Sequence, residues 1–148
     1  MENKIINILL ADDDESDRFI FIEAFTELKI KSIVETVKNG VELMSWLEDE
    51  KKQLPHLLFL DLNMPKKNGI QCLKEIRSSQ KLKDLSVVIY STSNSAKDIE
   101  ESFINGANIY IHKPADYTVL KNVLEKAVTT AYQYRGDGMN RENFILKI

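Results

Sequence analysis

Cysteine is almost absent from the sequence, which has a single residue of this type, so no disulfide can form within the chain. Cys72 falls in a segment of helical periodicity, where we expect a small core residue. Glycine and proline are also scarce, at five and three residues, and there is no low-complexity stretch or internal repeat. These absences exclude a disulfide-rich scaffold and a repeat protein.

Long hydrophobic runs are missing as well, so the sequence contains no candidate membrane span. The first apolar stretch, residues 5–11, is interrupted by Asn7 and runs directly into three aspartates. It therefore lacks the length and flanking residues of a signal peptide. We expect a cytoplasmic protein that has no membrane partner.

The chain has no surplus of positive charge, because its formal net charge is -3 and its pI is about 5.5. The pair Lys66-Lys67 is too short to form a basic patch for nucleic acid. A chain of 148 residues, 43% hydrophobic and 29% charged, can bury the core of one soluble domain but has no room for a second. One folded domain that does not bind nucleic acid is the expectation.

Short apolar runs alternate with longer segments of helical periodicity along the chain. The expected strands lie near residues 5–10, 32–37, 57–62, 87–90 and 109–112. A helix follows each strand, with apolar faces formed in turn by Phe19, Ile22, Phe25 and Leu28; by Val41, Leu43, Met44 and Leu47; by Cys72, Leu73 and Ile76; by Ile99, Phe103 and Ile104; and by Tyr117, Leu120, Val123, Leu124, Ala127 and Val128. Gly106 is expected to end the fourth helix. Apolar strands that are each followed by a helix imply a doubly wound (βα)5 sandwich, in which helices cover both faces of a five-stranded parallel sheet.

Polar side chains follow four of these strands at the carboxyl end of the expected sheet. They are Asp12 and Asp13 after the first strand, Asp61 at the end of the third, Ser91 and Thr92 after the fourth, and Lys113 after the fifth. The loops at this end of an open α/β sheet converge at the topological switch point. The sequence therefore predicts one pocket that contains carboxylates, a hydroxyl and an ammonium group.

Clustered aspartates with ordinary pKa values near ~3.9 repel one another at neutral pH, so such a pocket needs a cation. Oxygen ligands favour a hard ion, Mg2+ before Ca2+, and Zn2+ is disfavoured because no Cys/His cluster accompanies them. Magnesium favours phosphate chemistry, in which Lys113 would add positive charge and Ser91 would hydrogen-bond a phosphoryl oxygen. Asp61 is then free to be a nucleophile that forms an aspartyl phosphate. We interpret Asp14, Glu15 and Asp17 as a solvated helix start favoured by the helix macrodipole.

Taken in order, these motifs resemble the response-regulator receiver domains of bacterial two-component signalling. They are the acidic pair Asp12-Asp13, the loop Leu60-Asp61-Leu62-Asn63-Met64-Pro65 with Gly69, the hydroxyl of Ser91, and Lys113-Pro114. The resemblance covers the chain from residue 4 to about 132 and implies a flavodoxin-like strand order of 2-1-3-4-5. It divides the chain into a receiver domain, residues 1–135, and a C-terminal tail, residues 136–148.

The resemblance also implies the roles of the acidic residues. Asp13, Asp61 and the backbone carbonyl of Asn63 would coordinate Mg2+, for which Mn2+ could substitute, and Asp12 would assist through water. Asp61 would be the phosphoacceptor for a sensor histidine kinase or a phosphotransfer protein. We expect the first helix to set kinase specificity through Ser16, Phe19 and Ile20.

A conformational switch is implied in the same way. Lys113 would pair with the phosphoryl group, Thr92 would border its entrance, and Ser91 would move together with the aromatic switch residue Tyr110. This movement would alter the surface formed by the fourth helix, the fifth strand and the fifth helix. The peptide bond between Lys113 and Pro114 is expected to be cis.

No effector sequence follows the receiver, so we expect a single-domain regulator that acts by protein contact or phosphate relay. It would be a signalling phosphoacceptor with self-catalysed phosphotransfer and dephosphorylation rather than an enzyme. An unphosphorylated scaffold remains the main alternative. An aspartate-nucleophile phosphatase would need a second aspartate where this chain has Asn63, and Asp12, Asp13 and Asp14 would repel the phosphate of a flavodoxin-like nucleotide ligand.

The end of the chain, residues 144–148, is too apolar for a solvated tail. We expect residues 139–148 to pack on their own domain or on a second copy of the chain. The family resemblance adds a homodimer through the fourth and fifth helices as an expectation.

Overall fold

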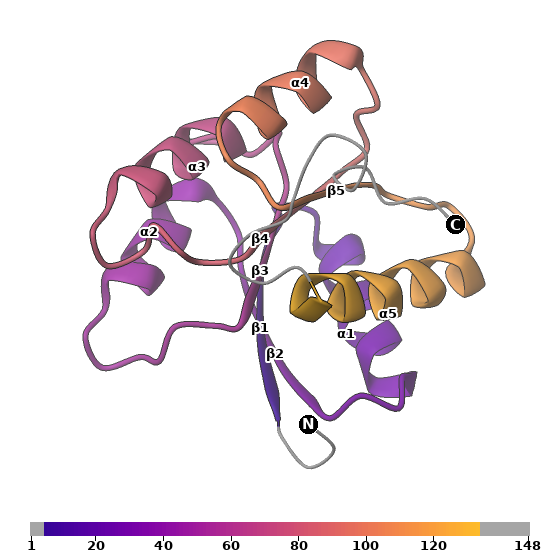
Figure 1. The fold of residues 1–148 in the computed structure, drawn as a ribbon. Coiled ribbons are helices and arrows are strands. Elements are labelled where there is room, and N and C mark those ends of the chain that lie inside the picture. Colours follow the sequence, from indigo (N-terminus) through magenta and orange to yellow (C-terminus); the bar gives the residue numbers. More distant parts are fainter. Residues whose placement is uncertain (1–4, 134–148) are drawn as a thin grey trace.

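Strands and helices alternate along the computed structural model, which describes residues 5–133 of the chain (Figure 1). In chain order the described elements are β1 (Ile6–Ala11), α1 (Glu15–Glu27), β2 (Ser32–Val37), α2 (Gly40–Glu48), β3 (Leu57–Leu60), α3 (Gly69–Ser78), β4 (Val87–Ser91), α4 (Ala96–Ile104), β5 (Ile109–His112) and α5 (Tyr117–Gln133). This is the alternation that the sequence predicts.

The strands form one parallel sheet in the order β2-β1-β3-β4-β5. β1 is paired on both sides, so that Ala11 lies opposite both Val37 of β2 and Leu60 of β3. The predicted doubly wound sandwich and its strand order are confirmed. The register also brings the carboxyl ends of β1 and β3 side by side.

The sheet separates two apolar layers. Leu9 and Ala11 of β1 face a layer closed by α2 and α3, against which α4 packs Ile99 and Phe103. Ile8 and Leu10 face the opposite layer, which α1 and α5 close. Figure 1 shows α1 and α5 on one side of the sheet and α2, α3 and α4 on the other. Both faces of the central strands are therefore removed from water, as their continuous apolar sequences require.

Short polar side chains begin all five helices. A backbone N–H in the first turn donates a hydrogen bond to Asp14 in α1, Asn39 in α2, Asn68 in α3, Ser95 in α4 and Asp116 in α5. Gly106 terminates α4 as predicted: Ile104 is the last residue of the helix, and Gly106, two residues later, adopts a positive φ of 97°. The N–H of Gly106 donates to the carbonyl of Phe103 and that of Ala107 to Ser102, which is the Schellman pattern.

The predicted apolar face of α1 is half right, because Phe25 is buried and Leu28 packs against the core, but Phe19 and Ile22 do not face the sheet. The buried residues of the helix are Phe21, Ala24 and Phe25, whereas Phe19 and Ile22 are 65% and 40% exposed. The run Phe19-Ile20-Phe21-Ile22 is apolar on every side of the helix, so periodicity alone cannot determine which side meets the sheet.

Two further predicted face residues, Val41 and Ile104, are also exposed. Val41 lies in the first turn of α2 and Ile104 is the last residue of α4. Both therefore lie at helix ends, where a side chain can project beyond the sheet that the helix covers. The rest of α2 follows the prediction, with Leu43, Met44 and Leu47 buried.

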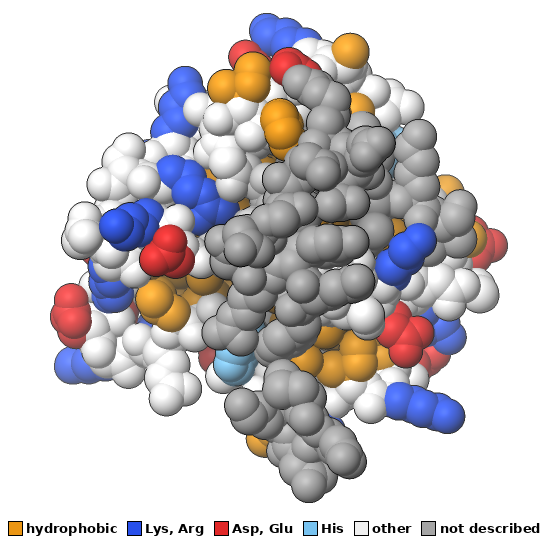
Figure 2. All heavy atoms as spheres, in the orientation of Figure 1, with side chains coloured by type: hydrophobic (Ala, Val, Ile, Leu, Met, Phe, Trp, Pro, Cys, Tyr) orange, Lys and Arg blue, Asp and Glu red, His pale blue; other side chains and the backbone are white. Residues whose placement is uncertain are grey.

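The predicted tail, residues 136–148, and its expected packing lie outside the described residues. Within residues 5–133, no helix combines the length and apolar composition needed to cross a membrane. On the face seen in Figure 2, basic side chains are spread among acidic ones and do not gather into one patch.

Candidate functional site

Three carboxylates meet where β1 and β3 end. Asp12 follows β1 directly, Asp61 follows β3, and the N–H of Asp61 donates to the carbonyl of Ala11 at 3.0 Å. One oxygen from each of Asp12, Asp13 and Asp61 lies within 4.8 Å of the others. Asp12 and Asp61 are buried and Asp13 is exposed, so solvent reaches the cluster from the side of Asp13.

The loop after Asp61 is held tightly against the start of α3. The N–H of Gly69 donates to the carbonyl of Leu62 at 2.9 Å, and a Cβ on Gly69 would lie only 2.4 Å from the Asp61 carbonyl oxygen. Glycine is needed here because the two backbones approach so closely. The N–H of Asn63 points back to Asp61 Oδ1 at 3.4 Å, which leaves Asp61 in a compact loop.

Lys113 reaches this cluster from the end of β5. Its Nζ lies 2.7 Å from Asp12 Oδ2, 2.9 Å from Asp17 Oδ2 and 3.4 Å from Asp61 Oδ2. The same nitrogen lies 5.2 Å from the centre of the Tyr90 ring, a cation–π distance. The structure thus brings together the predicted residues Asp12, Asp61 and Lys113.

Burial dominates the electrostatics of the site. It raises the pKa of Asp61 to about 6, with the charge of Asp12 acting in the same direction and that of Lys113 opposing it. Burial also raises the pKa of Asp12. For Lys113 burial acts to lower the pKa, but hydrogen bonds to Asp12 and Asp17 and the charge of Asp61 outweigh it, so the pKa is raised. The Lys113 ammonium group stays charged, but the carboxylates of Asp12, Asp17 and Asp61 that surround it outnumber it.

The donor set fits a hard divalent cation. Within the described residues the cluster contains only carboxylate groups and no His or Cys. Oxygen ligands with an open side for water are the preference of Mg2+. Asn63 is placed by the same loop, and the predicted coordination by its carbonyl stays a prediction.

The predicted switch residues meet at Ser93. Ser91 is fully buried and its Oγ accepts from the N–H of Ser93 at 3.1 Å, while the hydroxyl of buried Tyr110 donates to the Ser93 carbonyl at 2.6 Å. The Ser93 hydroxyl in turn donates to Asp98 of α4 at 2.5 Å. Thr92 is exposed. Ser93 therefore connects the predicted pair to α4.

The prediction of a cis peptide bond between Lys113 and Pro114 is wrong. The described residues contain no cis peptide bond, so the bond between Lys113 and Pro114 is trans. A residue–proline bond prefers trans by about 0.5–1 kcal/mol, and the Lys113 ammonium reaches Asp12 and Asp61 with the trans bond. A cis bond is therefore not needed to direct the lysine in this structure.

Asp17 and Ser93 are the site residues that sequence reasoning missed. The sequence predicts Asp17 in a solvated helix start, but its carboxylate pairs with Lys113. The available signal was its place in the first turn of a helix that begins three residues after Asp12. Ser93 lies two residues after Ser91, and no sequence pattern indicates that it contacts both Ser91 and Tyr110.

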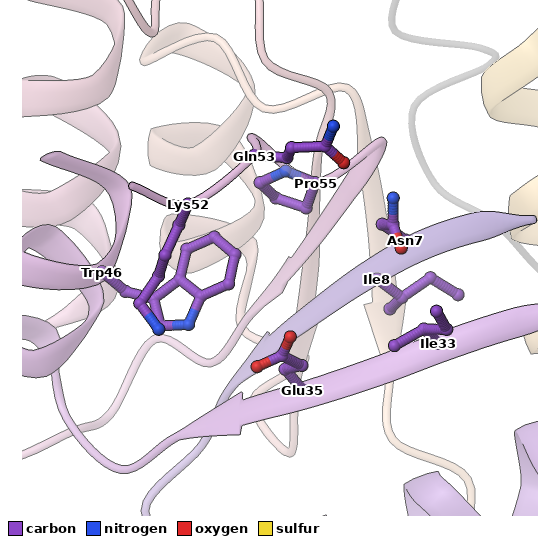
Figure 3. A pocket seen from close by; sticks show the side chains of 8 residues that line it. All are labelled: Asn7, Ile8, Ile33, Glu35, Trp46, Lys52, Gln53 and Pro55. Atoms are coloured by element: carbon purple, nitrogen blue, oxygen red, sulfur yellow. The ribbon is translucent and has the colours of Figure 1, made fainter. Parts of the chain in front are cut away.

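A separate surface pocket opens at the opposite end of the sheet (Figure 3). It is lined by Asn7, Ile8, Ile33, Glu35, Trp46, Lys52, Gln53 and Pro55. Lys52 Nζ lies 5.2 Å from the centre of the Trp46 ring, and Figure 3 shows the two side chains next to each other. None of the acidic cluster lines this pocket, so it is no part of the candidate site.

Comparisons with known proteins agree with this geometry. The family model for the response regulator receiver domain matches residues 8–125. A chemotaxis protein CheY homolog of Campylobacter jejuni is 30% identical over 125 residues, which cover 84% of this chain and 94% of that protein. The response regulator Rcp1 of Synechocystis is 32% identical over 110 residues, which cover 72% of this chain and 75% of Rcp1.

Solved structures give the same result. The phosphorylated cyanobacterial phytochrome response regulator RcpA has a TM-score of 0.78 and 34% identity, over 88% of this chain and 95% of RcpA. The Mn2+-bound form of Rcp1 has a TM-score of 0.75 and 27% identity, over 91% of this chain and 99% of Rcp1.

Proposed function

This chain belongs to the response regulator receiver family, and from that premise we propose that Asp61 is its phosphoacceptor in a Mg2+-dependent reaction. The observation that carries the proposal is the placement of Asp61. It is buried at the end of β3, within reach of Asp12, Asp13 and Lys113. A carboxylate with a raised pKa beside an ammonium group is suited to nucleophilic attack.

Asp13 and Asp61, with the carbonyl of Asn63, would hold Mg2+, and Asp12 would assist through a water ligand. Mn2+ could take the place of Mg2+. When bound, Mg2+ neutralises phosphoryl oxygens that would otherwise repel the carboxylates. Lys113 supplies positive charge 3.4 Å from Asp61 Oδ2, where it can pair with a phosphoryl oxygen as charge develops. The Asp61 oxygen forms the bond to phosphorus while the bond to the donor's leaving group breaks.

The contacts at Ser93 support a route from the site to the surface. If Ser91 turns its hydroxyl towards a phosphoryl oxygen, it gives up the hydrogen bond from the Ser93 N–H. Ser93 also holds the Tyr110 hydroxyl and Asp98, so movement of its backbone changes the position of α4 and the room around the ring. The face formed by α4, β5 and α5 is then the output surface.

Two kinds of partner complete the proposal. The phosphoryl donor is a histidine kinase or a phosphotransfer protein, and the exposed Phe19 and Ile20 with Ser16 on α1 form its contact surface. Exposed apolar side chains of this size are a feature of protein-binding faces. The output surface binds a downstream protein or a second copy of this chain.

Incubation with a small acyl-phosphate donor and Mg2+ tests the proposal, with intact mass as the measurement. Wild type should gain the mass of one phosphoryl group without any kinase, and Asp61→Asn should gain none. Asp84→Asn, which removes an exposed carboxylate elsewhere, is the matched control and should behave as wild type.

Equal phosphate uptake by Asp61→Asn would overturn the assignment of the phosphoacceptor. No uptake by wild type would favour the alternative of an unphosphorylated scaffold. Steady turnover of the donor without accumulation of phosphoprotein would favour a phosphatase instead.

A further inference from the structure

The Lys113 ammonium forms its two shortest contacts away from the proposed phosphoacceptor. The distances from Nζ are 2.7 Å to Asp12 and 2.9 Å to Asp17, against 3.4 Å to Asp61. Asp17 thus competes directly with Asp61 for this group.

Asp17 is held in place by the way α1 begins. Its N–H donates to Oδ1 of the N-cap residue Asp14 at 2.8 Å. Its neighbour Arg18 donates from Nη1 to the carbonyl of Asp12 at 2.8 Å. These bonds fix the backbone of the first turn of α1 against the end of β1, which places Asp17 within reach of Lys113.

We propose that Asp17 is a positioning residue that shares the Lys113 ammonium with Asp12 and so holds it off Asp61, leaving the Asp61 carboxylate open to the cation. This inference rests on the proposed function, because it concerns the availability of the same carboxylate. An ammonium group has three N–H donors, and three carboxylates surround this one.

Loss of the Asp17 charge would shift the Lys113 ammonium group towards Asp61. Asp12 is already at 2.7 Å, so an ammonium group released by Asp17 would move closer to Asp61, which now lies at 3.4 Å, and the attraction between two charges grows as their separation falls. A closer Lys113–Asp61 pair competes with a divalent cation for the same oxygen atoms. Asp17→Asn should therefore weaken binding of Mg2+ through Lys113.

A double-mutant cycle on Mg2+ affinity separates this effect from simple charge loss. Wild type, Asp17→Asn, Lys113→Met and the double variant are titrated with Mg2+ by calorimetry. Asp17→Asn should weaken Mg2+ binding by about threefold to tenfold when Lys113 is present, and by less than about twofold in the Lys113→Met background. A charge effect without the lysine would give equal fold-changes in the two backgrounds, and that result would overturn the proposal.

Glu15→Gln is the matched control, because it removes the same charge from an exposed residue in the same helical turn. It should change Mg2+ affinity by less than about twofold. A fold-change equal to that of Asp17→Asn would also overturn the proposal.

A direct measurement on Asp17→Asn covers the case in which Lys113→Met fails to fold. The 1H–15N resonance of the Lys113 ammonium reports its surroundings, and in Asp17→Asn without metal it should shift or broaden relative to wild type. An unchanged resonance would contradict the proposal. Failure of the proposed function looks different, since wild type itself would then take up no phosphoryl group.

Discussion

At the scale of single residues, Asp61 is stabilised in its neutral form by the fold. Burial raises its pKa in the folded protein to about 6, against ~3.9 for an unperturbed aspartate. Between these two values the folded state binds more protons than the unfolded state, so the free energy of unfolding falls as pH rises from about 4 to about 6. Above that window the metal-free protein carries the full cost of the charged carboxylate.

Asp61→Asn should therefore stabilise the metal-free protein at pH 7.5, by about 2–3 kcal/mol at most. The gain should shrink as pH falls through 6 and vanish near 4, where the wild-type carboxylate is protonated in both states. Urea unfolding of both proteins in a chelating buffer across this pH range measures the difference in the free energy of unfolding. Asp84→Asn, which removes an exposed carboxylate elsewhere, is the control, and a gain for Asp61→Asn that is constant with pH would contradict the explanation.

The sequence predicts the positions of Asp12, Asp61 and Lys113 because each directly follows a strand of a parallel sheet, and parallel strands end at one edge. Asp17 was missed for a different reason. Its contact depends on the rotation of α1 about its own axis, and the apolar run of that helix conceals the rotation.

At the scale of elements, Arg77 joins α3 to the loops around it. Its guanidinium donates to the carbonyls of Gly106, Lys83 and Leu85 and to Oδ1 of Asn108. A planar group with five donors can satisfy these separate acceptors at once, whereas an ammonium group cannot.

Arg77→Lys should lower the free energy of unfolding by about 2 kcal/mol, because several part-buried acceptors lose their donors. Thermal or urea unfolding gives the value. Lys74→Arg, an exposed exchange on the same helix, should have little effect. A negligible effect of Arg77→Lys would mean that water replaces the guanidinium.

Element boundaries were predicted best where the sequence has a local stop. Gly106 ends α4 because it supplies the positive φ that the turn needs. By contrast, β3 was expected to run to residue 62 but ends at Leu60, because Asp61 and Leu62 turn towards Gly69. Hydrophobicity alone does not distinguish a buried loop residue such as Leu62 from a strand residue.

At the scale of the whole molecule, cation binding and folding are coupled. The carboxylates come from segments far apart in sequence and meet only in the folded chain, so a cation that binds them stabilises the fold. At a concentration one hundred times its dissociation constant the gain is about 2.7 kcal/mol.

Mg2+ at such a concentration should raise the melting temperature of wild type by about 5–10 °C. Asp13→Asn removes an exposed member of the cluster and should abolish most of the rise, while Asp84→Asn should retain it. Scanning calorimetry with and without Mg2+ measures both. An equal rise in Asp13→Asn would place the bound cation elsewhere.

β3 is paired with β1 on one side and β4 on the other, and all four of its residues are buried. Its amide hydrogens should therefore be among the slowest to exchange with deuterium, since their exposure requires opening of the whole domain. The segment around Ser93 lies nearer the surface and can open locally. Asp61 thus follows the strand whose hydrogen bonds should open least often. Phosphorylation would then move the segment around Ser93 while the backbone of Asp61 stays in place.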